Sequence, residues 1–386
     1  MSFEIQTANM NTKGREIAQK QTPRFAEYSP DLEEIKEKAS EKEFENLIVI
    51  GNGGSITSFR AYLYAFLPEI DKDVRLVTTM DPDYLNRLSR ELEAENTLVV
   101  PVSKSGETVG VLEALMFFME KGYEILPVTS DNDGALKSIV EREGLDWVEH
   151  PDIGGRFTGA AETALVPAAL AGMDVDEIRS GAEDMYEKLE PGKENAARDL
   201  AEKLFEAEEN GFTDILTPFY STRMFGFYPL FVQLMHETVC KEGEGQTVYG
   251  DLGPEYQHHT NQRMFGGKEN IVPLFFRTET HEHAQITVPE GLKDVKVRGR
   301  ELGELERNSY SRALKSEYTG VKHALGNDGR PYATLTLEEL SYSSGGELVA
   351  FMQYLAVYSA WFRGVNPFNQ PDVEKSKQIG FEERFK

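Results

Sequence analysis

Cysteine is almost absent from this chain: Cys240 is the only one, so an intramolecular disulfide is excluded. Long apolar runs are also missing, because no stretch reaches the roughly 18 apolar residues that indicate a membrane-spanning helix. Residues 1–20 contain no hydrophobic region of the secretory type. These absences predict a cytoplasmic protein that does not insert in a membrane and is stabilised by its core rather than by cross-links.

Basic residues are scarce relative to acidic ones, at 41 against 66, which gives a formal net charge of -25. A field of this sign repels nucleic acid and anionic membrane surfaces, so neither is expected as a partner. It also repels phosphorylated metabolites at long range. A ligand of that kind would need a local pocket lined by cations or backbone amides.

The first part of the chain alternates apolar strands with longer helical segments. Predicted strands cover 46–51, 74–79, 97–102 and 124–129. Helical patterns follow them at 56–67, 82–92, 108–120 and 134–143, and an apolar helix lies near 159–171. Strands that alternate with helices of about ten or more residues indicate a parallel sheet with crossover helices.

A second cycle of the same kind follows a charged stretch at 176–208, which we interpret as solvated helices. Its predicted strands cover 214–219, 270–277 and 332–337, and its apolar helices cover 222–239 and 346–363. The fold class is therefore α/β, with two doubly wound domains at 31–175 and 176–365. An N-terminal arm or leading helix at 1–30 precedes them, and a C-terminal segment at 366–386 follows.

Two loops in the first domain have the composition of anion-binding loops. Residues 51–55 read GNGGS and residues 103–108 read SKSGET, each between a strand and a helix. Glycines let the backbone approach a ligand, and the free N–H groups at a helix start attract anions. Neither loop is a dinucleotide fingerprint or a Walker motif. Because both follow strands of one parallel sheet, they should meet at its carboxyl edge, where such sheets bind ligands.

These loops, together with three later segments, resemble the glucose-6-phosphate isomerase family, in its shorter prokaryotic form with two sugar isomerase domains. The later segments are Gly154-Gly155-Arg156-Phe157-Thr158, the glutamate loop Lys241-Glu242-Gly243-Glu244-Gly245-Gln246, and the run from Gly364 to Glu374 (GVNPFNQPDVE) with Lys377. They occur in the family's order, and the resemblance spans about residues 45 to 380.

The resemblance implies interconversion of glucose 6-phosphate and fructose 6-phosphate by a homodimer that needs no cofactor or metal. It assigns the catalytic base to Glu242, ring opening to His258, and further catalytic roles to Arg156 and Lys377. The residues that it assigns to sugar or phosphate binding are Gly54, Ser55, Ser103, Lys104, Ser105, Thr108 and Gln370. It also implies that a neighbouring subunit donates His258 to the site, and the apolar helix at 346–363 is a candidate dimer surface.

Some alternatives stay open at this point. Glu244 competes with Glu242 for the role of base, and the span from Glu242 to His258 is shorter than in the family. His259 competes with His258, which is preferred because it lies four residues before Gln262, a residue with a family counterpart. The H-E-H pattern at His281 and His283 has no third metal ligand and is interpreted as a solvated loop. A phosphosugar-binding regulator without activity is the alternative function, as is an isomerase that also accepts mannose 6-phosphate.

Overall fold

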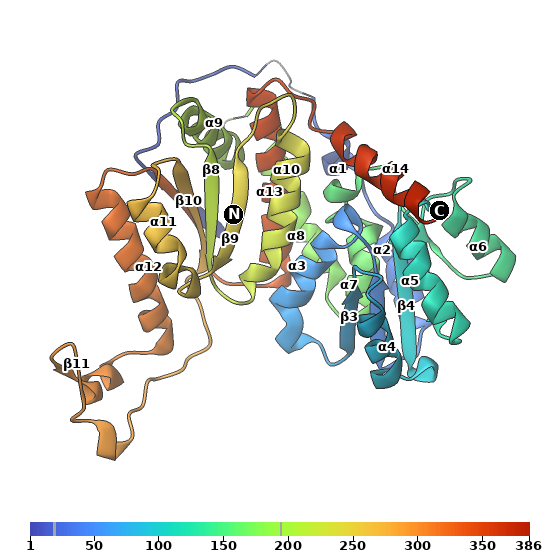
Figure 1. Ribbon diagram of the computed structural model, residues 1–386, viewed down its shortest axis with the longest axis horizontal. Coiled ribbons are helices and arrows are strands. Elements are labelled where there is room, and N and C mark those ends of the chain that lie inside the picture. The colour runs from blue at the N-terminus through green and yellow to red at the C-terminus, as the bar shows by residue number, and fades with distance from the viewer. Residues whose placement is uncertain (18–20, 194) are drawn as a thin grey trace.

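Two mostly parallel sheets lie on either side of a central layer of helices in the computed structural model, which describes residues 1–17, 21–193 and 195–386 (Figure 1). One hydrophobic core continues from the inner face of each sheet into this layer. The α/β fold class with two doubly wound sheets is therefore confirmed. Among the described helices, none has both the length and the apolar character that a membrane crossing requires.

The first sheet has the strand order β3-β2-β4-β6-β7, and β5 also pairs with β4. Its strands are all parallel. Their bounds are β2 (Asn46–Ile50), β3 (Asp73–Val77), β4 (Thr97–Ser103), β5 (Glu124–Ile125), β6 (Val128–Thr129) and β7 (Val148–Glu149). The predicted strand at 124–129 is divided into β5 and β6, because Pro127 between them has no N–H to donate to the ladder.

The second sheet has the order β1-β13-β10-β8-β9. Its bounds are β1 (Phe3–Ala8), β8 (Asp214–Tyr220), β9 (Thr247–Leu252), β10 (Ile271–Thr278) and β13 (Tyr332–Leu337). Strand β1 corrects the prediction of an arm or leading helix at 1–30, because it pairs antiparallel with β13 as an edge strand. Its apolar-polar alternation covers only Phe3 to Gln6, which is a short strand signal, and its pairing partner lies at the other end of the chain. The boundaries of the two domains stay a prediction.

Helices of the central layer fill the space between the sheets. They are α3 (Thr57–Phe66), α7 (Glu162–Leu170), α8 (Val175–Lys188), α9 (Ala196–Glu209), α10 (Tyr228–Val239) and α13 (Tyr342–Phe362). The outer faces are covered by α4 (Pro82–Glu91), α5 (Val109–Glu120) and α6 (Ala135–Glu143) on the first sheet, and by α11 (Thr260–Gly266) and α12 (Tyr310–Asn327) on the second. The remaining helices are α1 (Arg24–Glu27), α2 (Leu32–Ser40) and α14 (Glu374–Glu383).

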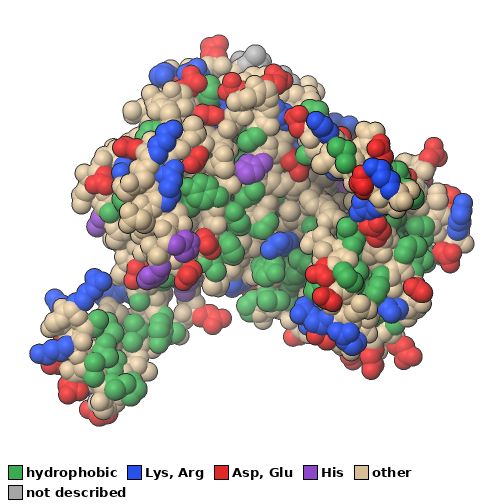
Figure 2. All heavy atoms as spheres, viewed as in Figure 1, with side chains coloured by type: hydrophobic (Ala, Val, Ile, Leu, Met, Phe, Trp, Pro, Cys, Tyr) green, Lys and Arg blue, Asp and Glu red, His purple; other side chains and the backbone are tan. Residues whose placement is uncertain are grey.

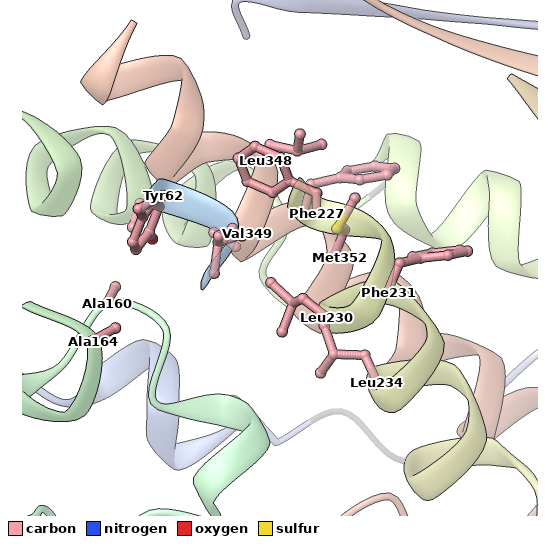
Figure 3. Close-up of a cluster of buried hydrophobic side chains, with 14 of the residues drawn as sticks. Tyr62, Ala160, Ala164, Phe227, Leu230, Phe231, Leu234, Leu348, Val349 and Met352 are labelled. Carbon is pink, nitrogen blue, oxygen red and sulfur yellow. The ribbon is translucent and has the colours of Figure 1, made fainter. Parts of the chain in front are cut away.

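Helix α13 is the most deeply buried helix of this layer, since all its residues from Ser344 to Ala360 are buried. Figure 3 shows Leu348, Val349 and Met352 of α13 among side chains from α3, α7 and α10. The expectation that the 346–363 helix forms a dimer surface is therefore wrong. A helix that is apolar on all sides is typical of the interior of a chain, and the described residues of α13 leave no exposed apolar face that a second subunit could cover.

Helices α8 and α9 are also part of the core, which corrects their interpretation as solvated helices. Each exposes a charged face and buries an apolar one, so their charge content alone was misleading. Helix α8 approaches α13 backbone to backbone through Gly181 and Gly346. A Cβ atom on Gly181 would lie 2.0 Å from the carbonyl oxygen of Ser343, and one on Gly346 would lie 2.0 Å from that of Ile178.

The two sheets share one pattern of connections. Strands β2, β3, β4 and β6 take the same places in the first sheet that β8, β9, β10 and β13 take in the second. In each set the first strand lies between the second and the third. Helices α3 and α10, which follow the first strands, face the central layer, whereas α5 and α12, which follow the third, lie on the outer faces. Each sheet therefore has a topological switch point between its first and third strands.

We predict that Gly181→Ala lowers the free energy of unfolding by about 1–3 kcal/mol, because the new methyl group overlaps the backbone of α13. Urea unfolding followed by circular dichroism measures this. Gly320→Ala on α12 is the control, since nothing lies within 4 Å of the added Cβ there. Alanine should be neutral or stabilising at that helical position by up to about 1 kcal/mol. Equal midpoints for the two variants would contradict the close approach.

Candidate functional site

The two anion-binding loops lie at the switch point of the first sheet. Residues 53–55 form a 3₁₀ turn, η1 (Gly53–Ser55), after β2, and residues 103–108 connect β4 to α5. Because β2 and β4 are neighbours, both loops reach the same part of the carboxyl edge. At this point the helices that follow the two strands lie on opposite faces of the sheet. A crevice that can bind a ligand opens between such connections.

Hydroxyl groups gather in the second of these loops. The Ser103 and Thr108 side-chain oxygens are 3.0 Å apart, and the Ser105 Oγ accepts a hydrogen bond from the backbone N–H of Glu107. Gly106 has φ = 68°, a left-handed conformation that favours glycine, and it turns the chain into α5. Hydroxyl donors and the N-terminal N–H groups of α5 thus surround a place suited to an anion.

Gly54 brings the first loop against a third one. A Cβ atom on Gly54 would lie 2.3 Å from the backbone nitrogen of Arg156, so only glycine allows this contact. Lys104 joins the second loop to the same region, because its Nζ is 2.9 Å from Asp152 Oδ1. Together with Arg24, Lys104 lowers the pKa of the Asp152 carboxyl. Both anion-binding loops therefore contact the segment 152–156.

Arg156 is almost fully buried and ties together distant parts of the chain. Its Nε donates to Thr238 Oγ1 at 2.9 Å, at the end of α10. Its two other nitrogens donate to the C-terminal segment: to Gln370 Oε1 at 2.8 Å, and to the carbonyl oxygens of Pro367 and Asn369 at 2.6 and 3.2 Å. Burial lowers the pKa of its guanidinium, and Glu237, 3.4 Å away, opposes this shift. Arg156 and Gln370, two of the predicted site residues, are therefore bonded directly to each other.

The partners of Arg156 on α10 were not found from the sequence. Gln233 accepts from Thr57 Oγ1 at 2.7 Å and donates to Glu237 Oε1 at 3.0 Å, so it connects the start of α3, which follows the first loop, to the carboxylate beside Arg156. Gln233 and Glu237 are four residues apart, and that spacing places two side chains on one face of a helix. The spacing of polar residues within a strongly apolar helix was the signal that could have found them.

The glutamate loop begins directly after α10. Lys241 is buried, and its Nζ donates to the carbonyl oxygens of Thr238 and Asn366. Burial and the charge of Arg156 lower the pKa of Lys241 to about 8. Glu242, the next residue, is exposed and has φ = 57°, a conformation that is costly for a residue other than glycine. Since Thr238 contacts both Arg156 and Lys241, the loop that carries Glu242 starts beside the arginine.

His258 is held at the opposite end of the second sheet from Glu242. The glutamate loop is fixed at the amino end of β8, where Gln246 Nε2 donates to the carbonyl oxygen of Phe212. The turn η6 (Glu255–His258) is fixed at the carboxyl end of β8, where Gln257 Nε2 donates to Tyr220 Oη. Strand β8 separates these two ends by roughly 20 Å. Within one chain the structure therefore does not bring His258 to the other predicted site residues.

The two candidate histidines have different surroundings. His258 lines a surface hollow together with Asn261 and Gln262. His259 contacts its own neighbours instead, with Nδ1 2.7 Å from Thr260 Oγ1 and Nε2 3.7 Å from Asp251 Oδ2. The hollow favours His258 as the residue that is available to a ligand, and its role stays a prediction.

Lys377 lies in the first turns of α14, an exposed helix. Its Nζ is 2.8 Å from Glu374 Oε1, and its side chain is mostly exposed. Arg384 near the end of α14 pairs with Glu113 of α5 at 2.6 Å, so this helix lies beside α5, as Figure 1 shows. Helix α5 starts at the second anion-binding loop. The C-terminal segment thus extends from its contacts with Arg156 to α5, the helix that follows the second anion-binding loop.

Comparisons with known proteins can be set beside this geometry. No protein-family model matches the sequence. A glucose-6-phosphate isomerase of Thermus thermophilus is 30% identical over 358 residues, covering 87% of this chain and 83% of that protein. A hypothetical protein of Thermus thermophilus has a crystal structure that matches with a TM-score of 0.85 at 28% identity, covering 93% of this chain and 88% of that chain.

A glucose-6-phosphate isomerase of Chlamydia trachomatis shares the fold with a TM-score of 0.75 at 23% identity, covering 98% of this chain and 81% of that one. The paired doubly wound sheets and their loops define the class of sugar isomerase folds. At 30% identity over most of both chains, this chain belongs to the glucose-6-phosphate isomerase family. The resemblance seen in the sequence is thereby confirmed.

Arg156→Lys should release the C-terminal segment. Lysine keeps the charge but cannot reproduce the planar fork that binds Pro367, Asn369 and Gln370 together. Hydrogen bonds from a charged donor contribute about 1.5–3 kcal/mol each, so the loss of one alone should speed local opening at least about tenfold. Limited proteolysis with mass spectrometry should show faster cleavage within 366–386.

Arg384→Lys is the matched control for this experiment, because its carboxylate partner Glu113 is partly exposed and the pair contributes little. Cleavage of this control should remain within about threefold of the unsubstituted chain. If Arg156→Lys is cleaved no faster than Arg384→Lys, the arginine does not hold the segment.

Proposed function

We propose that this chain interconverts glucose 6-phosphate and fructose 6-phosphate by opening the sugar ring and moving a proton between C1 and C2 through an enediolate. The single observation that carries the proposal is the Arg156 network. It joins the loops at the switch point of the first sheet, the start of the glutamate loop and the C-terminal segment with Gln370. Membership of the isomerase family supports the same reaction.

The substrate phosphate is assigned to residues 103–108. Charge-assisted hydrogen bonds from Ser103, Ser105, Thr108 and the start of α5 offset the repulsion by a chain of net charge -25. Lys104 reaches this loop but is partly neutralised by Asp152. Gly54 and Ser55, one strand away, would contact the sugar. This placement leaves C1 and C2 toward Arg156 and the glutamate loop.

Glu242 is the proposed base and Arg156 the proposed stabiliser of the enediolate. A carboxylate removes the proton, and the guanidinium remains protonated at any working pH and offsets the negative charge that develops on the oxygen. The left-handed backbone at Glu242 supports this role, because strained conformations gather at functional sites. Glu244, two residues later, has no such strain. The aldose and ketose are isomers, so the reaction needs proton transfers alone and no redox cofactor.

A homodimer completes the proposed site. The roughly 20 Å between the ends of β8 keeps His258 from the Glu242 of its own chain, so a second chain must supply the histidine that opens the ring. The excursion 279–309, which includes β11 (Lys296–Val297) and β12 (Arg300–Glu301), projects from the body and supports this arrangement (Figure 1). Figure 2 shows apolar side chains on it. Among them, Leu292, Val295, Val297 and Leu305 are each at least 40% exposed.

Purified protein should form glucose 6-phosphate from fructose 6-phosphate in a coupled assay, with and without a chelator. In the same assay Glu242→Gln should lower kcat by at least ~10²–10⁴-fold, because the amide keeps the shape but cannot accept the proton. Its KM should change much less. Absence of turnover by the unsubstituted dimer would overturn the isomerase and leave the phosphosugar-binding regulator.

Two controls separate chemistry from folding. Glu244→Gln makes the same change in the same loop and should retain most of the activity; an inactive Glu244→Gln beside an active Glu242→Gln would transfer the role of base. Glu242→Gly should be inactive yet no less stable, because glycine tolerates the φ of 57°. Arg298→Gly relieves a similar φ of 50° in the excursion and should remain active.

A mixing experiment tests the sharing of the site between subunits. Glu242→Gln and His258→Ala are each expected to be nearly inactive on the cyclic sugar phosphate. After dissociation and reassociation of an equimolar mixture, about half of the dimers are mixed by random pairing, and each has one intact site of two. The mixture should therefore regain roughly a quarter of the unsubstituted activity. No gain, with hybrid dimers seen by native mass spectrometry, would place Glu242 and His258 in one chain's site.

A further inference from the structure

The second sheet has a switch point of its own, between β8 and β10. Their carboxyl ends are Tyr220 and the pair Arg277-Thr278. A cavity of about 200 Å³ opens there. Its polar lining includes Arg277, Thr278, Glu279, Ser311, Arg312 and Lys315. This place in the second sheet corresponds to that of the anion-binding loops in the first, because the two sheets share their strand connections. The proposed isomerase site does not use it.

The cavity is cationic in a strongly acidic chain. Arg277, Arg312 and Lys315 face it, against the single carboxylate of Glu279. Arg277 and Lys315 both contact Glu279 and hold the pKa of its carboxyl at about 2, so Glu279 is ionised and the cavity retains an excess of positive charge at neutral pH. Burial, and then the charge of Arg277, lower the pKa of the nearby His281. His281 lines this cavity and is partly buried, whereas His283 is exposed, as expected of a solvated loop.

Arg277 is the group that suggests a ligand. It is only 6% exposed and lies 5.3 Å from the ring centre of Tyr318. Its Nη1 is bound to Glu279 and lies 3.5 Å from Thr336 Oγ1, whereas Nε and Nη2 have no hydrogen-bond partner in the part of the chain that the structure describes. A buried guanidinium with unused donors that lines a cavity is arranged for a planar or tetrahedral oxyanion.

We infer that this cavity is a second anion site, which binds a small phosphorylated metabolite at the switch point of the second sheet. Arg277 supplies unused donors from a largely buried side chain, Arg312 and Lys315 supply charge from the first turns of α12, and Thr278 and Ser311 supply hydroxyls. Lys315 can exchange Glu279, 3.2 Å away, for the phosphate. This inference is independent of the proposed isomerase reaction, because none of the residues that line the cavity is assigned to that reaction.

Equilibrium dialysis of radiolabelled inorganic phosphate against the full-length protein tests the inference by counting sites per chain. The unsubstituted protein should bind two phosphates per chain. Arg312→Gln with Lys315→Gln should bind one, or bind the second at least about tenfold more weakly. Both side chains are exposed, so the substitutions should not affect folding. Lys296→Gln with Arg298→Gln in the excursion removes the same charge elsewhere and should leave two sites.

Ser105→Ala with Thr108→Ala should remove the other phosphate, and all four substitutions together should remove both. Malonate added at the same concentration as phosphate should displace less than half of the second phosphate. Displacement of half or more would overturn the preference for phosphate. One site per chain that Ser105→Ala with Thr108→Ala abolishes, or two sites in Arg312→Gln with Lys315→Gln, would overturn the site itself. Turnover is not measured here, so failure of this site and failure of the isomerase reaction remain distinguishable.

Discussion

The candidate site depends on one physical constraint: a buried guanidinium must find partners for its donors. Arg156 cannot leave them without partners, because desolvation of a charged group is costly. Its partners come from α10 and from the C-terminal segment, which lies more than two hundred positions further along the chain. The glycine contact at Gly54 adds the loops of the first sheet to the same point. Because its buried charge requires hydrogen-bond partners, Arg156 positions elements that belong to both sheets.

The central layer of helices makes this meeting possible. Gly181 and Gly346 let α8 and α13 approach closely, and α13 then fills the space between the inner faces of the sheets. The carboxyl edge of the first sheet is thereby placed near the end of α10, at the amino edge of the second. The carboxyl edge of the second sheet, with His258 and the Arg277 cavity, is left on the far side of β8. The two switch points of one repeated topology thus have different surroundings.

Most of the regular elements were predictable because their signals are local. Buried parallel strands such as β2, β4 and β10 read as mostly continuous apolar runs, and the anion-binding loops follow two of them directly. The signals failed where burial depends on a distant partner. Strand β1 has only a short apolar-polar alternation and is held in the sheet by β13, and α8 has a buried apolar face among its charged residues. The roles of Glu242, His258 and Lys377 rest on family resemblance and stay predictions.

The sequence by itself determined the class of fold, the family, and two loops with the composition of anion-binding loops, because periodicity and short motifs are properties of neighbouring residues. The tertiary structure alone decided which distant groups meet. Arg156 contacts Thr238 and Glu237, and Glu237 in turn is bonded to Gln233. Helix α13 is part of the core instead of a dimer surface. The same holds for the Arg277 cavity, whose charges come from β10 and α12. Electrostatics and packing act through space, and no local pattern records which segments the folded chain brings together.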